Sequence, residues 1–114
     1  MLSVKEQGIL RCIINHCSNI EEDTFTMSQE EFDADRKTQN SVCFDILQIG
    51  ELVKSLPDAF IDKYDEMPWK DIKGMRDWVA HGYQKINMSQ VWNTATKEIQ
   101  PLRIYCESLL KTSA

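Results

Sequence analysis

Apolar residues along this chain recur at intervals of three and four, and no segment alternates regularly between apolar and polar positions. The first pattern predicts helices, and the missing alternation disfavours strands. A first helix is expected over residues 3–19, ending at an acidic segment. Its apolar stripe consists of Ile9, Ile13, Cys17 and Ile20. His16 lies beside this stripe, where a lone histidine is more often packed or capping than catalytic.

A second helix is predicted over residues 28–56. Ser28 can cap its first turn while the side chain of Glu31 reaches back to the backbone, which is the capping-box arrangement. Pro57 follows its far end, as expected for a helix boundary. The stripe of apolar positions that this helix should bury consists of Val42, Ile46, Ile49, Val53 and Leu56.

Two residues near the end of this second helix stand out. Gly50 lies inside the helix, where glycine costs about 1 kcal/mol relative to alanine, so we expect a closely packed neighbour there. Glu51 follows it and has two interpretations of equal weight. It faces water, or it pairs with an interior arginine and supports a functional site.

Prolines divide the second half of the chain. Residues 57–68 have mixed polarity and predict a connector with a short helical turn. Pro68 can open a third helix, because its missing N–H would have no partner in the first turn. A last helical stretch starts near Ser89, and Pro101 predicts a kink or a restart within it. The apolar positions expected to face the core in these two helices are Ile72, Met75, Val79, Val91, Ala95, Ile99, Leu102, Cys106 and Leu109.

These segments together predict an all-α fold, an antiparallel bundle of four to five helices, in a single domain over residues 1–114. A chain of 114 residues with 42% hydrophobic residues suits one soluble globular core. No apolar run approaches the ~20 residues needed to span a bilayer, and the start of the chain lacks the pattern of a signal peptide. We therefore expect a cytoplasmic protein with no membrane segment.

The four cysteines form no C-x-x-C pair and lie among helical apolar positions. This placement favours buried reduced thiols over disulfides or zinc ligands. They are Cys12, Cys17, Cys43 and Cys106. The sequence also has no acidic metal cluster and no glycine-rich phosphate loop, so neither a metal nor a cofactor is predicted.

The segment from Arg76 to Tyr83 reads R-D-W-V-A-H-G-Y and gathers a guanidinium, an imidazole and a phenol. Arginine binds phosphate through a planar fork of donors, histidine moves protons near neutral pH, and tyrosine adds a hydroxyl that can bond or be modified. The combination indicates phosphodiester chemistry.

Spacing limits how these groups can meet. Five residues on a regular helix rotate a side chain by about 140°, so Arg76 and His81 cannot share one stripe. Either the helix ends near His81, as Gly82 would permit, or a second copy of the chain completes the cleft across a two-fold axis.

The pattern R-x-x-x-x-H-x-Y resembles the signature of HEPN-domain ribonucleases, in particular the small HepT-like toxins, and Arg76, His81 and Tyr83 match it. The likeness extends to M-P-W-K-D-I-K-G-M-R, which leads into the motif, and to I-G-E at residues 49–51. It covers the chain from about Arg36 to the C-terminus. One departure is Asp77, where this family more often carries an asparagine.

The resemblance implies a metal-independent endoribonuclease that forms a homodimer with the motif at the interface and acts as the toxin of a toxin–antitoxin pair. It also implies an antitoxin partner of the MNT-type nucleotidyltransferase class. In some systems this partner silences the toxin by adding AMP to the motif tyrosine, here Tyr83. The added phosphate would place bulk and negative charge beside Arg76 and repel the substrate.

RNA cleavage by the neighbouring 2′-hydroxyl needs proton transfer and a positive group near the reacting phosphate. His81 would act as general base or acid, because the reference pKa of histidine, about 6.5, suits both roles. Arg76 would hold the phosphate. Asp77, four residues before His81, either orients the imidazole or repels the substrate. Since deoxyribose lacks the attacking hydroxyl, RNA and not DNA is the expected substrate.

The net charge of −5 argues against a generally basic surface for nucleic acid. Acidic residues crowd into residues 21–35, however, whereas lysines lie near the motif in the sequence and can create a locally positive field. These lysines are Lys63, Lys70, Lys73 and Lys85.

Two other functions stay open on the sequence alone. The chain could be a catalytically inactive helical adaptor, or a substrate-binding partner of a nucleotidyltransferase, which the negative charge and Asp77 favour. It could also be a dimeric structural bundle in which Arg76 and His81 only bond each other across the interface.

Overall fold

The computed structural model describes residues 1–81 and 87–113, except for the side chains of Trp78, Ala80, His81 and Ser113. Over these residues the chain forms helices and no strand, which confirms the predicted all-α class. The elements are, in chain order, α1 (Val4–Thr24), α2 (Gln29–Asp33), α3 (Arg36–Lys54), α4 (Asp58–Lys63), α5 (Trp69–His81), α6 (Met88–Asn93), the π-helix η2 (Thr94–Glu98) and α7 (Ile99–Ser113).

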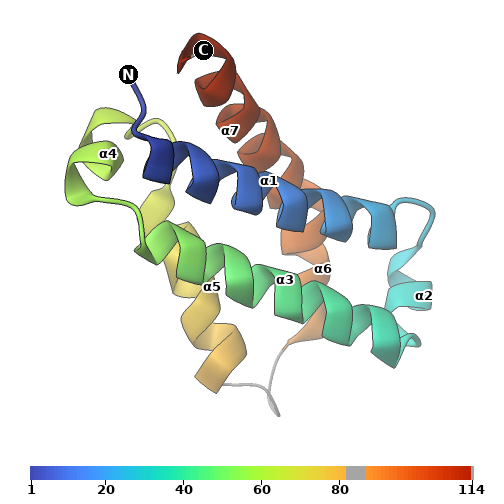
Figure 1. The fold of residues 1–114 in the computed structure, drawn as a ribbon. Helices are drawn as coiled ribbons and strands as arrows, with labels where there is room; N and C mark the ends of the chain where they lie inside the picture. Colours follow the sequence, from blue (N-terminus) through green and yellow to red (C-terminus); the bar gives the residue numbers. More distant parts are fainter. Residues whose placement is uncertain (82–86, 114) are drawn as a thin grey trace.

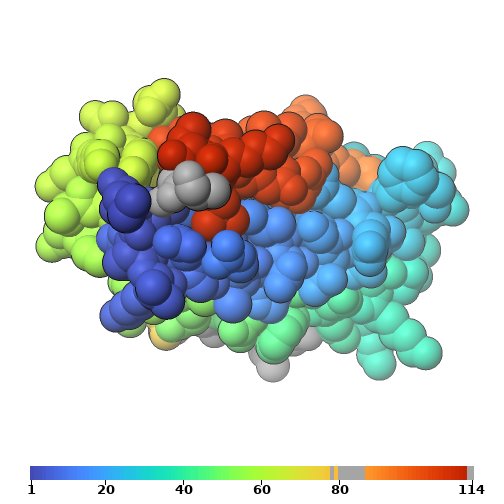
Figure 2. Space-filling model, turned by 45° about the horizontal axis from the view of Figure 1, so that its top comes forward, coloured from blue at the N-terminus to red at the C-terminus, as the bar shows by residue number. Residues whose placement is uncertain are grey.

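The long helical segments pack as a bundle, with the short α2 and α4 near its opposite ends (Figure 1). Helices α1 and α3 lie side by side and run in opposite directions, while α5 packs on α3 and α7 packs on α1. Figure 2 shows α1 along one face of the molecule, with α7 on one side of it and α3 on the other. This arrangement confirms the expected antiparallel helical bundle.

A single cluster of buried apolar side chains fills the space between these helices. The stripes predicted for all four long segments belong to it, and only Leu109 among the predicted positions is no more than partly buried. On α5 the buried positions Ile72, Met75 and Val79 fix the rotation of the helix. That rotation decides which way the intervening polar residues of the motif point.

Helix α1 is longer than the sequence analysis predicts. It continues through the acidic residues to Thr24, not stopping near Asn19. Glu21 accepts hydrogen bonds from the guanidinium of Arg103 on α7, at 2.5 Å from Nε and 3.2 Å from Nη2. Ile20 and Thr24 are buried. Glu21 is thus paired with a residue across the bundle, and α1 keeps a buried face in the acidic segment where the sequence composition indicated that the helix ends.

The expected second helix is two helices. Ser28 forms the predicted capping box with Glu31, but the helix that it caps is the short α2, which ends at Asp33. A new helix, α3, begins at Arg36, and the side chain of Asp35 caps it by accepting from the backbone N–H of Thr38 at 3.1 Å. Since Phe32 is fully buried, α2 serves to anchor the connection between α1 and α3.

Pro101 behaves as predicted, because the helix restarts just before it. α6 ends at Asn93, η2 follows over five residues, and α7 begins at Ile99. Proline lacks an N–H and its ring clashes with the preceding turn. In a regular helix the N–H of residue 101 would bond to the carbonyl four residues earlier, which lies in η2. A π-type turn at that place is a usual way to accommodate the missing hydrogen bond.

Three of the cysteines are buried free thiols, as predicted, namely Cys17, Cys43 and Cys106. The prediction is wrong for Cys12, which is exposed. Cys12 directly precedes the fully buried Ile13, so its side chain leaves α1 about 100° away from the core. None of the described helices is long and apolar enough to cross a membrane.

Candidate functional site

The centre of the candidate site is the contact between Arg76 on α5 and Gly50 on α3. A Cβ built on Gly50 would lie 2.5 Å from the Cβ of Arg76, 3.0 Å from its backbone nitrogen and 3.2 Å from its Cα. Such distances are too short for any side chain other than hydrogen. The prediction that Gly50 has a packing reason is therefore confirmed, and the closely packed neighbour is the motif arginine itself.

Two carboxylates bind the guanidinium of Arg76. Its Nε donates to Oε1 of Glu51, the residue after Gly50, and its Nη1 donates to Oδ1 of Asp77 at 3.1 Å. The hydrogen bond that Arg76 donates to Asp77, followed by the hydrogen bond to Glu51 and the charge of Glu51, raises the pKa of Arg76. Of the two interpretations of Glu51, the structure supports the ion pair with an arginine.

This guanidinium remains within reach of solvent. The side chain of Arg76 is 32% exposed, and those of Glu51 and Asp77 are 42% and 66% exposed. A guanidinium carries five N–H donors, and the two contacts use one each from Nε and Nη1. The remaining three donors of Arg76 have no partner among the described residues, so they are available to an anion, although the carboxylate of Asp77 stands beside them.

The other two motif residues are His81, whose side chain the structure does not describe, and Tyr83, which lies outside the described residues. Helix α5 is described as far as His81, and the expected end of the helix near this residue stays a prediction because the residues that follow lie outside the described part of the chain. The structure thus brings together Arg76, Glu51 and Asp77, and the placement of the histidine and the phenol stays a prediction.

The other histidine of the chain has a structural partner that the sequence did not reveal. Nδ1 of His16 on α1 lies 2.8 Å from Oδ1 of Asp45 on α3, and the side chain of Asp45 is only 5% exposed. Phe44 meets the imidazole edge-on, with 6.3 Å between ring centroids. His16 therefore ties α1 to α3, which agrees with the packing role expected for it.

The lysines expected around the motif divide into two groups. Lys70 and Lys73 lie on α5 and, together with Lys54 of α3, line a concavity between the two helices. Lys63 lies on α4, where its ammonium sits 5.4 Å from the ring centroid of Tyr64. Lys85 lies outside the described residues.

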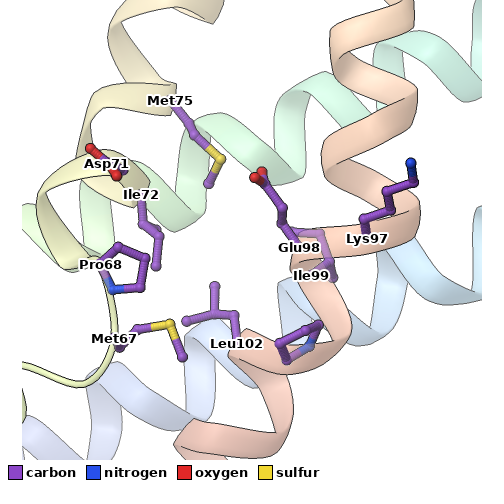
Figure 3. Close-up of a pocket in the computed structure, with 10 residues that line it drawn as sticks. Met67, Pro68, Asp71, Ile72, Met75, Lys97, Glu98, Ile99 and Leu102 are labelled. Carbon is purple, nitrogen blue, oxygen red and sulfur yellow. The ribbon is translucent and has the colours of Figure 1, made fainter.

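A second cavity that involves α5 lies elsewhere on this helix. It has a volume of about 330 Å³ and is lined by residues from the start of α5, from η2 and from α7. Figure 3 shows Met67, Ile72, Met75 and Leu102 around it, with Glu98 and Lys97 toward one side. Because Met75 and Arg76 are adjacent, their side chains leave the helix about 100° apart. This apolar cavity is thus separate from the contact between Arg76, Glu51 and Asp77.

Within the described residues, no group of three or more His, Cys, Asp or Glu side chains is placed to hold a metal ion. The guanidinium of Arg76 is the group in this site that is suited to a phosphate, since guanidinium groups bind phosphate oxygens through paired N–H donors.

Comparisons with known proteins agree with this chemistry. The profile of the family described as "Ribonuclease HepT-like" matches residues 13–109. A protein of Methanocaldococcus jannaschii named "Putative RNase MJ0127" is 37% identical over 93 residues, which are 82% of this chain and 77% of that protein. One of Caldanaerobacter subterraneus named "Putative RNase TTE0752" is 34% identical over 102 residues, covering 90% and 91%.

A third relative, from Thermococcus cleftensis, is named "Probable ribonuclease HepT" and is 35% identical over 92 residues, covering 81% of this chain and 84% of that protein. No solved structure matches this chain. The family match spans α3, α5 and most of α7, and thus includes both sides of the contact between Gly50 and Arg76. This chain belongs to the HepT-like ribonuclease family of the HEPN class.

Proposed function

We propose that this chain is a metal-independent RNA endonuclease in which Arg76 and His81 act on one phosphodiester. The observation that carries the proposal is the position of Arg76. Its backbone is packed against Gly50, its Nε is bound by Glu51, and its side chain is partly exposed to solvent. A guanidinium fixed at its base and open at its end is suited to hold a phosphate in one orientation.

The reaction needs no group beyond those of the chain and the RNA. A base removes the proton of the 2′-hydroxyl, and the 2′-oxygen forms a bond to phosphorus. The bond from phosphorus to the 5′-oxygen breaks, and an acid gives that oxygen a proton. The products are a 2′,3′-cyclic phosphate and a 5′-hydroxyl. Arg76 stabilises the negative charge that grows on the phosphoryl oxygens, and His81 transfers a proton.

We further propose that two copies of the chain form this site as a homodimer. On a regular helix the side chains of Arg76 and His81 leave α5 about 140° apart, which separates their functions within one protomer. A two-fold axis near the end of α5 would bring the histidine of one copy toward the arginine of the other.

The biological role that we propose is that of the toxin in a toxin–antitoxin pair, with an MNT-type nucleotidyltransferase as antitoxin. Binding of this partner, or AMP addition to Tyr83, would silence the enzyme. Tyr83 follows the last residue of α5 by two positions. A phosphate attached there would compete for the donors of Arg76. Mass spectrometry of Tyr83 after incubation with the nucleotidyltransferase and ATP tests this, and an unmodified tyrosine argues against it.

Cleavage of single-stranded RNA in the presence of EDTA tests the central proposal. The natural chain should cut, whereas Arg76→Ala and His81→Ala should not. His16→Asn is the matched control, because it changes the other histidine and keeps a donor near the position of Nδ1 that faces Asp45. Equal cleavage by the natural chain and both motif variants would refute the assignment, and RNA left intact by the natural chain would refute the enzyme.

A second candidate is a catalytically inactive adaptor for a nucleotidyltransferase. The observation that favours it is the contact from Asp77 to Nη1 of Arg76, which places a negative charge where a substrate phosphate would bind. Intact RNA at every protein concentration, combined with a stable complex with the nucleotidyltransferase, would support the adaptor.

A further inference from the structure

Three lysines from two helices surround a concavity next to the candidate site. Lys54 comes from the last turn of α3, and Lys70 and Lys73 come from the first half of α5. The concavity has a volume of about 220 Å³, and its apolar lining includes the buried residues Val53 and Trp69. All three lysine side chains belong to exposed residues. Three exposed lysines therefore line a hollow whose other walls include buried apolar side chains.

This hollow continues the site of Arg76 along both helices. Lys73 precedes Arg76 by three residues on α5, which makes the two side chains neighbours on one helix face. On α3, Lys54 follows Glu51, the partner of Arg76, by three residues. At 1.5 Å per residue, the six residues from Arg76 to Lys70 span about 9 Å along α5. We call Lys54, Lys70 and Lys73 the lysine track.

The charges of the lysine track are not neutralised within the described part of the chain. None of its three lysines forms an ion pair there, whereas Arg76 and Arg103 are each bound by two carboxylates. One acidic residue, Asp58 of α4, also lines the hollow. Three lysines against one aspartate leave a local positive charge on a chain whose net charge is −5.

We infer that the lysine track binds the backbone phosphates of single-stranded RNA next to the phosphate held by Arg76. This inference rests on the proposed function and adds the path that the substrate takes over the protein. Lysines on flexible stems bind phosphates without reading the base, and a positive groove that follows a backbone is typical of sequence-tolerant binding to single strands. The track also explains how an acidic protein can bind RNA at one place on its surface.

The test compares two variants of equal charge change. In the track variant, Lys54, Lys70 and Lys73 are each replaced by Gln. In the control variant, Lys5, Lys37 and Lys111 are each replaced by Gln. These three lie on α1, at the start of α3 and at the end of α7, and none of them lines the hollow. Both variants lower the net charge equally, so any difference between them reports position.

Binding is measured by fluorescence anisotropy with an oligouridylate of roughly 12 nucleotides, 2′-O-methylated so that it cannot be cut. The track variant should bind at least about tenfold more weakly than the control variant at low salt. Its slope of log affinity against log salt should fall by up to about 2, since each phosphate contact with a single strand contributes about 0.7. Cleavage of the matching RNA by the track variant should show a raised KM with little change in kcat, because the track lies beside the reacting group.

Each outcome separates this inference from the proposed function. If the natural chain cuts RNA and the track variant binds and cuts like the control variant, the track is refuted while the enzyme stands. If the track variant keeps RNA binding but loses a nucleotidyltransferase partner, the lysines serve a protein interface and the inference is refuted. If no form of the chain binds or cuts RNA, the inference and the proposed function both fail.

Discussion

Gly50 on α3 faces the backbone of Arg76 on α5 so closely that a Cβ on the glycine would lie 2.5 Å from the Cβ of the arginine. This contact sets the separation of the two helices at the site. It also places Glu51, the next residue of α3, where its carboxylate meets the guanidinium. A structural feature of the bundle, the missing side chain at position 50, thereby positions a functional group.

Gly50→Ala should destabilise the fold and reduce RNA cleavage. Alanine improves helix propensity by about 1 kcal/mol, but overpacking against backbone atoms costs about 1–3 kcal/mol and cannot be relieved by a rotamer change. We expect a net loss of up to about 2 kcal/mol in the free energy of unfolding, measured with urea, because the overpacking outweighs the propensity gain.

Gly74→Ala on α5 provides a control in the helix that packs against α3. Nothing lies within 4 Å of a Cβ built on Gly74, so only helix propensity should change. The variant should gain about 0.5–1 kcal/mol and keep its cleavage rate. Equal effects of the two substitutions on stability would show that the close approach at Gly50 carries no energetic weight.

Asp77→Asn should strengthen RNA binding. The carboxylate of Asp77 lies 3.1 Å from Nη1 of Arg76 and competes with a phosphate for that group. Because the pair is exposed, the gain should be modest, roughly two- to fivefold in kcat/KM at low salt, and it should shrink as salt rises. The amide oxygen of asparagine can still accept the hydrogen bond, so the guanidinium keeps its orientation.

The control for Asp77→Asn is Asp71→Asn, which changes the net charge equally but lies at the apolar cavity on another side of α5. Kinetics with both variants distinguish a local effect from a general one. An equal gain in both would mean that only net charge matters, and a loss in Asp77→Asn would indicate that Asp77 serves the reaction, for example by orienting His81.

The sequence predicted the fold well because helix periodicity and caps are local signals. The buried stripes, the Ser28 capping box and the restart at Pro101 all depend on residues within one or two turns. The errors arose where a tertiary contact overrides local composition. Helix α1 runs past Asn19 because Glu21 meets Arg103, 82 residues away, and no local pattern announces that pair.

The candidate site was predicted only in part for the same reason. The motif identified Arg76, and the cost of glycine in a helix indicated a close neighbour for Gly50. The register between α3 and α5 decides which residue packs against Gly50 and whether Glu51 reaches it. Periodicity predicts which face of a helix is buried, but it does not predict the residue that this face contacts. Lys54 was missed because it joins the site only through that register.

Alkylation of the thiols tests the burial of the core. Iodoacetamide at about pH 8 should modify Cys12 in the folded protein and leave the other cysteines intact, because the thiolate is the reacting form and needs access. Burial raises the pKa of the Cys106 thiol to about 12, and burial also raises those of Cys17 and Cys43. Mass spectrometry counts the modified thiols. Rapid modification of all four before unfolding in urea would contradict the buried core.

Replacing His16 should affect stability and not catalysis. His16→Ala leaves the carboxylate of Asp45, 5% exposed, without the ring nitrogen at 2.8 Å, and an unsatisfied buried acceptor costs about 1–3 kcal/mol. His16→Asn should recover part of this loss, because its amide N–H can replace Nδ1. Urea unfolding measures both values, and RNA cleavage per folded molecule should equal that of the natural chain. If a His16 variant stayed folded but lost cleavage, the proton transfer would have to be assigned to His16, and the assignment to His81 would be contradicted.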